Sequence, residues 1–156
     1  MTTSQHGFLG ALPPAHRDRL AAFAHDVEIP AGTRIFEEGG AADRFWIIRS
    51  GGAALDVHVP GRPPAVVETL GEGDLLGWSW LFEPYRWHLG AQARGTLLAA
   101  EFDAGRVRAA CGHDPAFGLA VTGAVAAVIA RRLKATRTRL LDLYGPPGGG
   151  AGGGDR

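Results

Sequence analysis

Hydrophobic and polar residues alternate along residues 27–102 in short runs that glycine and proline interrupt. The runs read RIFEEG, RFWIIRSG, AALDVHV, AVVETLGEGD and AQARGTLLAAEF. Short alternating runs rich in branched and aromatic residues are typical of an antiparallel sandwich or barrel. The spacing predicts about eight strands and places hairpin turns at SGGAA and PGRPP.

Helical periodicity flanks this β-rich region on both sides. A turn at Pro13 and Pro14 precedes Leu20 and Phe23 at helical spacing, which predicts a short helix before the strands. After the strands, DAGRVRAACGHD predicts another short helix, and residues 115–144 show a long helical pattern without internal proline. The predicted order is therefore helix, strands, short helix and long helix.

The length of 156 residues suits one domain with a real hydrophobic core, and not two independent ones. We expect this domain at residues 8–144, with the β-barrel at 27–102 and the long helix at 115–144. Residues 1–7 are predicted to form an N-terminal tail. Residues 145–156 read GPPGGGAGGGDR and are predicted to be disordered, because they carry too little apolar surface to bury.

The long helix has an apolar face of its own. Its members fall at alternating spacings of four and three, and they are Ile129, Leu133, Thr136, Leu140 and Leu143. Basic residues flank them at Arg131, Arg132, Lys134, Arg137 and Arg139. This spacing is the seam of a coiled coil and predicts a parallel homodimer. The alternative is an amphipathic helix that lies on its own sheet.

Composition narrows the class of protein. Sixteen basic and sixteen acidic residues give no net charge, so any site for an anion must be local. Cys111 is the only cysteine, which excludes an internal disulfide and favours a small buried residue over a reactive thiol. The N-terminus lacks the pattern of a signal peptide, and the apolar run LAVTGAVAAVIA is too short to span a bilayer. We expect a soluble cytoplasmic protein without a membrane segment.

The sequence offers little for catalysis. The six histidines are scattered, and none stands at the spacing of a metal-ligand pair. GEGDLLG lacks the Lys-Ser/Thr of a nucleotide triphosphate loop, and no nucleophile motif of the Gly-x-Ser-x-Gly type is present. The chain is predicted to be neither an enzyme nor a metalloprotein.

Three of the four tryptophans fall in one stretch, GWSWLFEPYRW, at residues 77–87. Arg86 is the only basic residue between Gly71 and Gln92. A guanidinium among flat aromatic faces suits an aromatic or apolar anion. The alternative is a pocket that its own tryptophans fill, because large aromatic residues in small barrels usually belong to the core.

EEG, FWIIRSGGAAL, LGEGDLLGWSWLF and ARRLKATRTRLLDL together resemble the cyclic-nucleotide-binding domain of the catabolite activator protein family. The resemblance covers nearly the whole chain, residues 8–144. It implies a mainly β fold with flanking helices, namely a jelly-roll barrel followed by a long C-terminal helix. It also implies a short helix inside the barrel, the phosphate-binding cassette, whose backbone N–H groups face a cyclic phosphate. The implied ligand is cyclic AMP, cyclic GMP or another small anion.

The resemblance assigns a set of ligand-binding residues, and the sequence departs from the family pattern among them. The set is Gly77, Trp78, Ser79, Trp80, Leu81, Arg86, Trp87, His88, Thr136 and Arg137. The family has a glutamate for the ribose hydroxyl where this chain has Trp78. The phosphate-binding arginine corresponds to Trp87, or to Arg86 if one extra residue is allowed, and both alignments are open. Thr136 matches a threonine that reaches the base in the family.

Two functions are compatible with these observations. One is a stand-alone module that senses a small anionic ligand and signals through its dimer helix. The alternative is a ligand-free interaction or scaffold protein with a degenerate cyclic-nucleotide-binding fold. The chain after the long helix lacks a recognition helix for DNA, so DNA binding by this chain alone is not expected. The basic residues of the long helix are interpreted mainly as a solvated face, and the alternative is a contact with an acidic protein partner.

Overall fold

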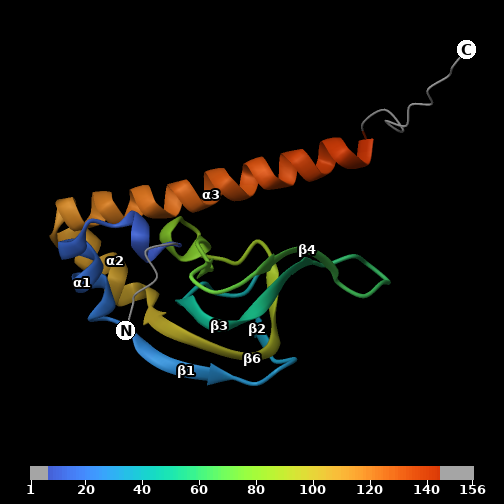
Figure 1. Ribbon diagram of the computed structural model, residues 1–156, viewed down its shortest axis with the longest axis horizontal. Helices are drawn as coiled ribbons and strands as arrows, with labels where there is room; N and C mark the ends of the chain where they lie inside the picture. The colour runs from blue at the N-terminus through green and yellow to red at the C-terminus, as the bar shows by residue number, and fades with distance from the viewer. Residues whose placement is uncertain (1–6, 145–156) are drawn as a thin grey trace, which may run out of the picture.

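The computed structural model describes residues 7–144, so the two predicted tails lie outside the described residues except for Gly7. The long C-terminal helix runs along one side of an antiparallel sheet, and the other two α-helices lie together at one end of that sheet (Figure 1). The elements are, in order, η1 (Leu9–Ala11), α1 (Pro14–Ala21), β1 (His25–Ile29), β2 (Arg34–Phe36), β3 (Arg44–Val57), β4 (Ala65–Leu70), β5 (Leu75–Leu76), η2 (Ser79–Leu81), β6 (Gly90–Asp103), α2 (Ala104–His113) and α3 (Pro115–Tyr144).

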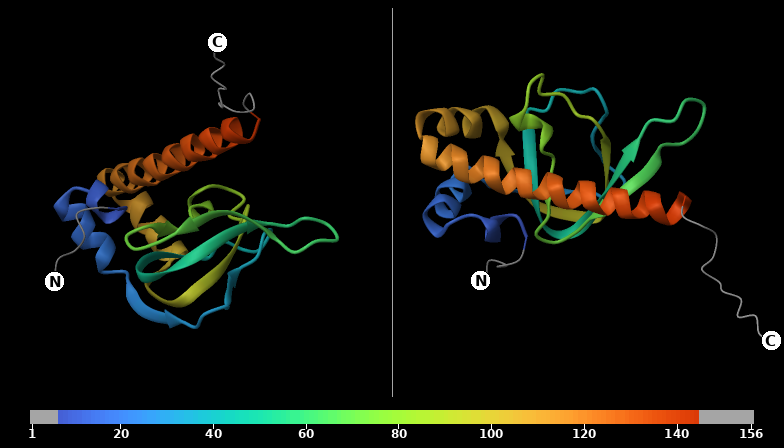
Figure 2. Two further views of the ribbon diagram at one scale, coloured as in Figure 1. Left: turned by 45° about the vertical axis from the view of Figure 1, so that its right-hand side comes forward. Right: turned by 90° about the horizontal axis from the view of Figure 1, so that it is seen from above.

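Two long antiparallel strands form the centre of the sheet. β3 and β6 have 14 residues each and pair from Arg44 opposite Asp103 to Asp56 opposite Gly90. The strand order is β1-β6-β3-β4, with β2 added to β6 and β5 added to β3. The strands curl round a common interior while α3 runs across one side (Figure 2). This arrangement confirms the predicted fold class, a mainly β jelly roll with a long C-terminal helix.

The number of strands differs from the prediction: residues 7–144 contain six strands, whereas the sequence pattern predicts about eight. The predicted hairpin turn at SGGAA is wrong: these residues lie inside β3. Gly51 takes a positive φ of 82°, and the pairing with β6 shifts register on both sides of Ser50. A bulge of this kind bends a strand without ending it. The turn at PGRPP is confirmed, since it joins the paired strands β3 and β4.

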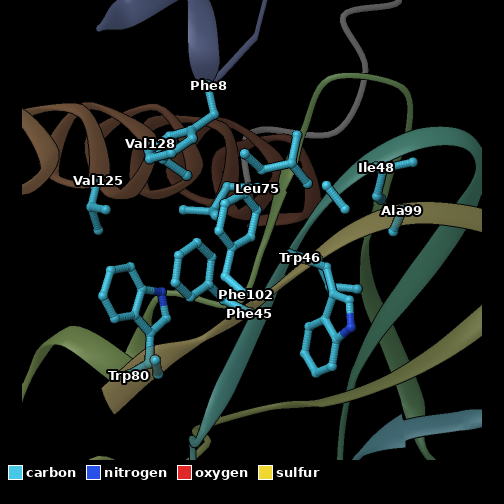
Figure 3. Packing of buried hydrophobic residues seen from close by; sticks show 14 of the residues in the cluster. Phe8, Phe45, Trp46, Ile48, Leu75, Trp80, Ala99, Phe102, Val125 and Val128 are labelled. Atoms are coloured by element: carbon cyan, nitrogen blue, oxygen red, sulfur yellow. The ribbon is translucent and has the colours of Figure 1, made fainter. Parts of the chain in front are cut away.

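Stacked aromatic rings fill the space between the sheet and α3. The Phe45 ring lies 4.0 Å from the Trp80 ring and 4.6 Å from the Phe102 ring, nearly parallel to both. Val125 and Val128 of α3 lie on the helix side of these rings (Figure 3). Burial of this apolar surface fixes the first half of α3 on the barrel.

The two halves of α3 differ in their surroundings. In the first half the buried residues are Phe117, Val121, Ala124, Val125 and Val128. In the second half the predicted seam is largely open: Leu133 is 68% exposed, Leu140 54% and Leu143 73%, whereas Ile129 packs partly against the core. The helix therefore lies on its own barrel at its start and presents apolar side chains to solvent at its end.

Within residues 7–144, α3 is the one helix that is long and apolar enough to cross a membrane, by length and composition only. Core helices of soluble proteins often meet the same two criteria.

Candidate ligand-binding site

The segment from Gly77 to Leu81 follows β5 directly and forms the short helix η2. Gly77 turns the chain with a φ of 96°, a conformation that favours glycine. The Trp80 side chain belongs to the core: its indole N–H donates to the Gly77 carbonyl oxygen at 3.0 Å, and it is fully buried against Phe45. Leu81 packs partly against the same core. These two residues anchor the segment, so its remaining side chains are held in place.

Arg108 of α2 anchors the segment from the helical side. Its Nη1 donates to the Trp80 carbonyl oxygen at 2.7 Å, and its guanidinium lies 4.1 Å from the centre of the Tyr85 ring. One cation thus contacts both η2 and the turn that follows it. The position of the short helix is therefore coupled to the position of α2.

Three side chains form the outer wall of the site. Ser79 Oγ and His88 Nδ1 lie 3.1 Å apart and share a hydrogen bond. The His88 ring stacks on the Trp78 indole with centroids 5.6 Å apart and an angle of 17°. Ser79 is buried, Trp78 half-buried and His88 exposed. This wall offers hydroxyl and imidazole groups beside the Trp78 indole.

Trp87 lies inside the barrel and is 5% exposed. Its ring stacks on Phe36 with centroids 3.9 Å apart and an angle of 13°. Backbone hydrogen bonds fix it at both ends, from Gly39 N–H to the Trp87 carbonyl at 2.8 Å and from Trp87 N–H to the Gly40 carbonyl at 2.9 Å. Of the two alternatives for the arginine position, Trp87 is therefore the residue that points inward.

Arg86 points the other way. The sequence led us to expect a partly buried guanidinium among aromatic faces, but Arg86 is exposed and its Nη1 donates to the Gly39 carbonyl oxygen at 3.3 Å. Within residues 7–144 it forms no ion pair with Glu83 or another carboxylate. The reason is the bridge between Arg86 and Ala41, because successive residues of an extended chain face opposite sides.

A cavity of about 30 Å³ remains between these groups. Its lining consists of Phe36, Leu55, Gly77, Trp78, Ser79, Trp87, His88, Leu89 and Arg132. Pockets that enclose drug-sized ligands measure roughly 300–1,000 Å³, whereas a water molecule takes up about 30 Å³ in the liquid. In this state the space is therefore too small for a nucleotide.

Arg132 is the residue of this site that the sequence interpretation missed. Its guanidinium reaches the cavity from α3, donates to the Leu75 carbonyl oxygen and lies 3.8 Å from a carboxylate oxygen of Glu68. Burial lowers the pKa of Arg132 and raises the pKa of Glu68, while their mutual attraction opposes both shifts. Helical spacing is the sequence signal that could have identified Arg132, because this residue follows the buried Val128 by four positions and shares its face of α3.

Thr136 and Arg137 are exposed on α3 and do not line the cavity. A single chain thus brings together the residues of the short helix, Trp87, His88 and Arg132, but not these two. No group of three or more His, Cys, Asp or Glu side chains capable of holding a metal occurs in the described part of the chain.

Comparison with known proteins identifies the fold and the family. The model of the cyclic nucleotide-binding domain matches residues 26–114, more than half of the chain. A CRP-like cAMP-activated global transcriptional regulator of Mycobacterium tuberculosis is 26% identical over 137 residues, which are 88% of this chain and 59% of the regulator. The chain therefore spans about three-fifths of the length of that relative.

Solved structures of cyclic nucleotide-binding proteins have a similar fold. A cyclic nucleotide-binding domain from Methylobacillus flagellatus superposes with a TM-score of 0.78 at 13% identity, covering 88% of this chain and 80% of that one. The catabolite activator protein of Thermus thermophilus superposes with a TM-score of 0.70 at 23% identity, covering 87% of this chain and 62% of that one. The chain belongs to the cyclic nucleotide-binding domain family and carries a CRP-like regulatory domain.

Proposed function

We propose that this chain is a regulatory module that senses a small anionic ligand beside residues 77–81 and signals through α3 as a homodimer. The observation that carries the proposal is that one cavity is lined both by the short-helix segment and by Arg132 of α3. A ligand in that space would contact the barrel and the helix at once. Binding would then change the packing of α3, which is the differential contact that a conformational signal requires.

Cyclic AMP in the family's usual pose fits this site poorly. Trp78 supplies no acceptor for the ribose hydroxyl. Of the two candidates for the family's arginine position, Trp87 points inward without a charge and Arg86 points outward. One lost charge-assisted contact costs roughly 1.5–3 kcal/mol, and each 1.4 kcal/mol is a tenfold change in affinity. We therefore expect cyclic AMP to bind at least about tenfold more weakly than to a family member that has both residues.

The second half of α3 supplies the proposed dimer contact. Leu133, Leu140 and Leu143 are more than half exposed, and a second copy of the helix would cover them. Thr136 and Arg137 lie on the same exposed half, so a partner helix packed on this half would lie close to them. An acidic protein partner is the further contact that the basic flank of α3 suits.

Calorimetry and thermal unfolding with cyclic AMP, cyclic GMP and cyclic di-GMP test the proposal directly. The variant Trp78→Glu/Trp87→Arg restores both family residues and should bind cyclic AMP at least about tenfold more tightly than the wild type. A wild-type protein whose melting temperature responds to no small anion would contradict the sensor function. If the restored variant also fails to bind while it stays folded, the assignment of the pocket itself is wrong.

The second candidate is a ligand-free interaction module, and the cavity of about 30 Å³ favours it. In that case Trp87 is permanent core, and α3 acts as a dimer or partner helix whatever small molecules are present. The two candidates differ in one measurement, the response of α3-mediated association to ligand. Neither candidate requires catalysis, DNA binding by this chain alone or a membrane, and both suit the cytoplasm.

A further inference from the structure

Trp87 lines two spaces of very different size. One is the cavity of about 30 Å³ beside the short helix. The other is a cleft of about 360 Å³, which Trp87 shares with residues of β2, β3 and the loop between these strands. The cleft is more than twice the roughly 150 Å³ that accommodates benzene in an engineered protein cavity. The indole therefore borders free space outside the small cavity.

The place that the indole occupies has the features of a slot for a flat ring. Phe36 covers one face of the indole at 3.9 Å, and the edge of the six-membered ring lies over Gly77, whose missing side chain leaves room for it. Stacking on an aromatic face stabilises a flat ring beyond the burial of its area. Arg132 and His88 line the same cavity.

We propose that the Trp87 indole stands in the place of the ligand, and that the ligand is an indole-sized aromatic ring carrying a carboxylate. This inference rests on the proposed sensor function and names its ligand class. The ring takes the slot against Phe36, the carboxylate faces Arg132 and His88, and the displaced Trp87 side chain turns into the cleft. Because hydrogen bonds to Gly39 and Gly40 hold its backbone, Trp87 moves by rotation of its side-chain bonds.

Electrostatics favour an anion on the pocket side. Arg132 is 14% exposed at its side chain and forms an ion pair with Glu68, 3.8 Å from Nε, and Asp74 adds a weaker attraction. A ligand carboxylate near the guanidinium would gain from the weak screening of a buried site. A ligand without ribose also needs no hydrogen-bond acceptor at Trp78, where the indole provides none. This distinguishes the proposed ligand from a cyclic nucleotide.

Chemical rescue of Trp87→Ala tests the proposal. Removing a buried tryptophan should lower the melting temperature by roughly 10 °C in a domain of this size. Indole-3-acetate should then bind by calorimetry at least about tenfold more tightly than neutral indole and recover much of the lost melting temperature. Adding Arg132→Met should remove the preference for the carboxylate. In the wild type, indole-3-acetate should change the tryptophan fluorescence as Trp87 leaves its stack.

Trp46→Ala is the matched control. Trp46 is another buried tryptophan of the same stack, but its indole N–H donates to the Glu101 carboxylate at 2.9 Å. The space left by this substitution is bordered by a negative charge, so indole-3-acetate should bind there no better than indole. If Trp87→Ala does not fold, Trp87→Leu leaves a smaller space, and phenylacetate against benzyl alcohol makes the same comparison.

The outcomes separate this inference from the function on which it rests. Equal affinity of the Trp87 variants for the charged and neutral ring, or no binding of either, overturns the inference. Cyclic nucleotide binding by the wild type would in that case still support a sensor. Conversely, tight binding of indole-3-acetate in the slot without any effect on α3-mediated association supports the ligand class and overturns the sensor function.

Discussion

The six-membered ring of Trp87 lies directly over Gly77. Two of its carbon atoms, Cη2 and Cζ3, are 2.7 and 2.8 Å from the place that a Cβ atom on Gly77 would occupy. Gly77 also has a φ of 96°, which side chains disfavour. The glycine is therefore required twice, for the backbone turn into the short helix and for the ring that closes the pocket.

Gly77→Ala should destabilise the fold by about 2–5 kcal/mol, since left-handed backbone costs roughly 1–2 kcal/mol and overpacking roughly 1–3 kcal/mol. Denaturant unfolding measures the effect. Gly71→Ala is the control, because nothing lies within 4 Å of its Cβ position and its φ is not in the left-handed region. Similar losses in both variants would show that Trp87 does not rest on Gly77.

Arg86→Met should leave the melting temperature nearly unchanged. Arg86 is exposed and makes one hydrogen bond of 3.3 Å, and surface substitutions of this kind usually change stability by less than about 0.5 kcal/mol. Arg108→Met, by contrast, removes the contacts to Trp80 and Tyr85 and should lower the melting temperature clearly. A large loss in Arg86→Met with little loss in Arg108→Met would reverse the roles assigned to the two arginines.

Arg132 and Glu68 should behave as a coupled pair. Arg132→Met leaves a partly buried carboxylate without its cation, and Glu68→Gln leaves the guanidinium without its carboxylate, so each should destabilise the protein. The double variant should be more stable than the sum of the two changes predicts, by about 0.5–3 kcal/mol. A double-mutant cycle by denaturant unfolding gives this number, and strict additivity would show that the pair is not formed.

Asp114 should make the protein more sensitive to acid. Backbone N–H groups of Phe117 and Ala116 donate to its carboxylate, and with Arg19 they lower the pKa of Asp114 below its ordinary value. A depressed folded-state pKa contributes stability above the unfolded pKa that disappears as the pH falls through the folded value. Melting temperatures between pH 6 and about pH 2 should therefore fall less steeply in Asp114→Asn than in the wild type. Parallel curves would contradict the capping role of Asp114 at the start of α3.

Leu133→Asp together with Leu140→Asp should yield a monomer by light scattering, because two charges on the exposed α3 face prevent a second helix from packing there. Leu119→Asp is a control on the first half of α3, where the side chain is 76% exposed and lies outside the predicted seam. The wild-type dimer should also tighten as salt is added, since basic residues flank the seam in both copies. An unchanged mass in the double variant would exclude the dimer through this face.

Local pattern determined the fold class and most element positions. Alternation along residues 27–102 and helical spacing over residues 115–144 depend only on neighbouring residues, and the structure places the sheet at 25–103 and α3 at Pro115–Tyr144. The same local argument failed at SGGAA, because glycine signals both a turn and a bulge. Pairing of β3 with β6, some forty residues away, is what keeps this segment in one strand.

The tertiary structure decided what the candidate site contains. Residues 86 and 87 have no local signal for which of them faces inward; the bridge to Ala41 and the hydrogen bonds to Gly39 and Gly40 determine it. Arg132 reaches the pocket only because α3 lies across the barrel. The aromatic cluster and its departure from the family pattern were visible in the sequence. The small size of the cavity beside Trp87 was not. Such volumes depend on how side chains distant in sequence fill a shared space, and no short-range pattern encodes that.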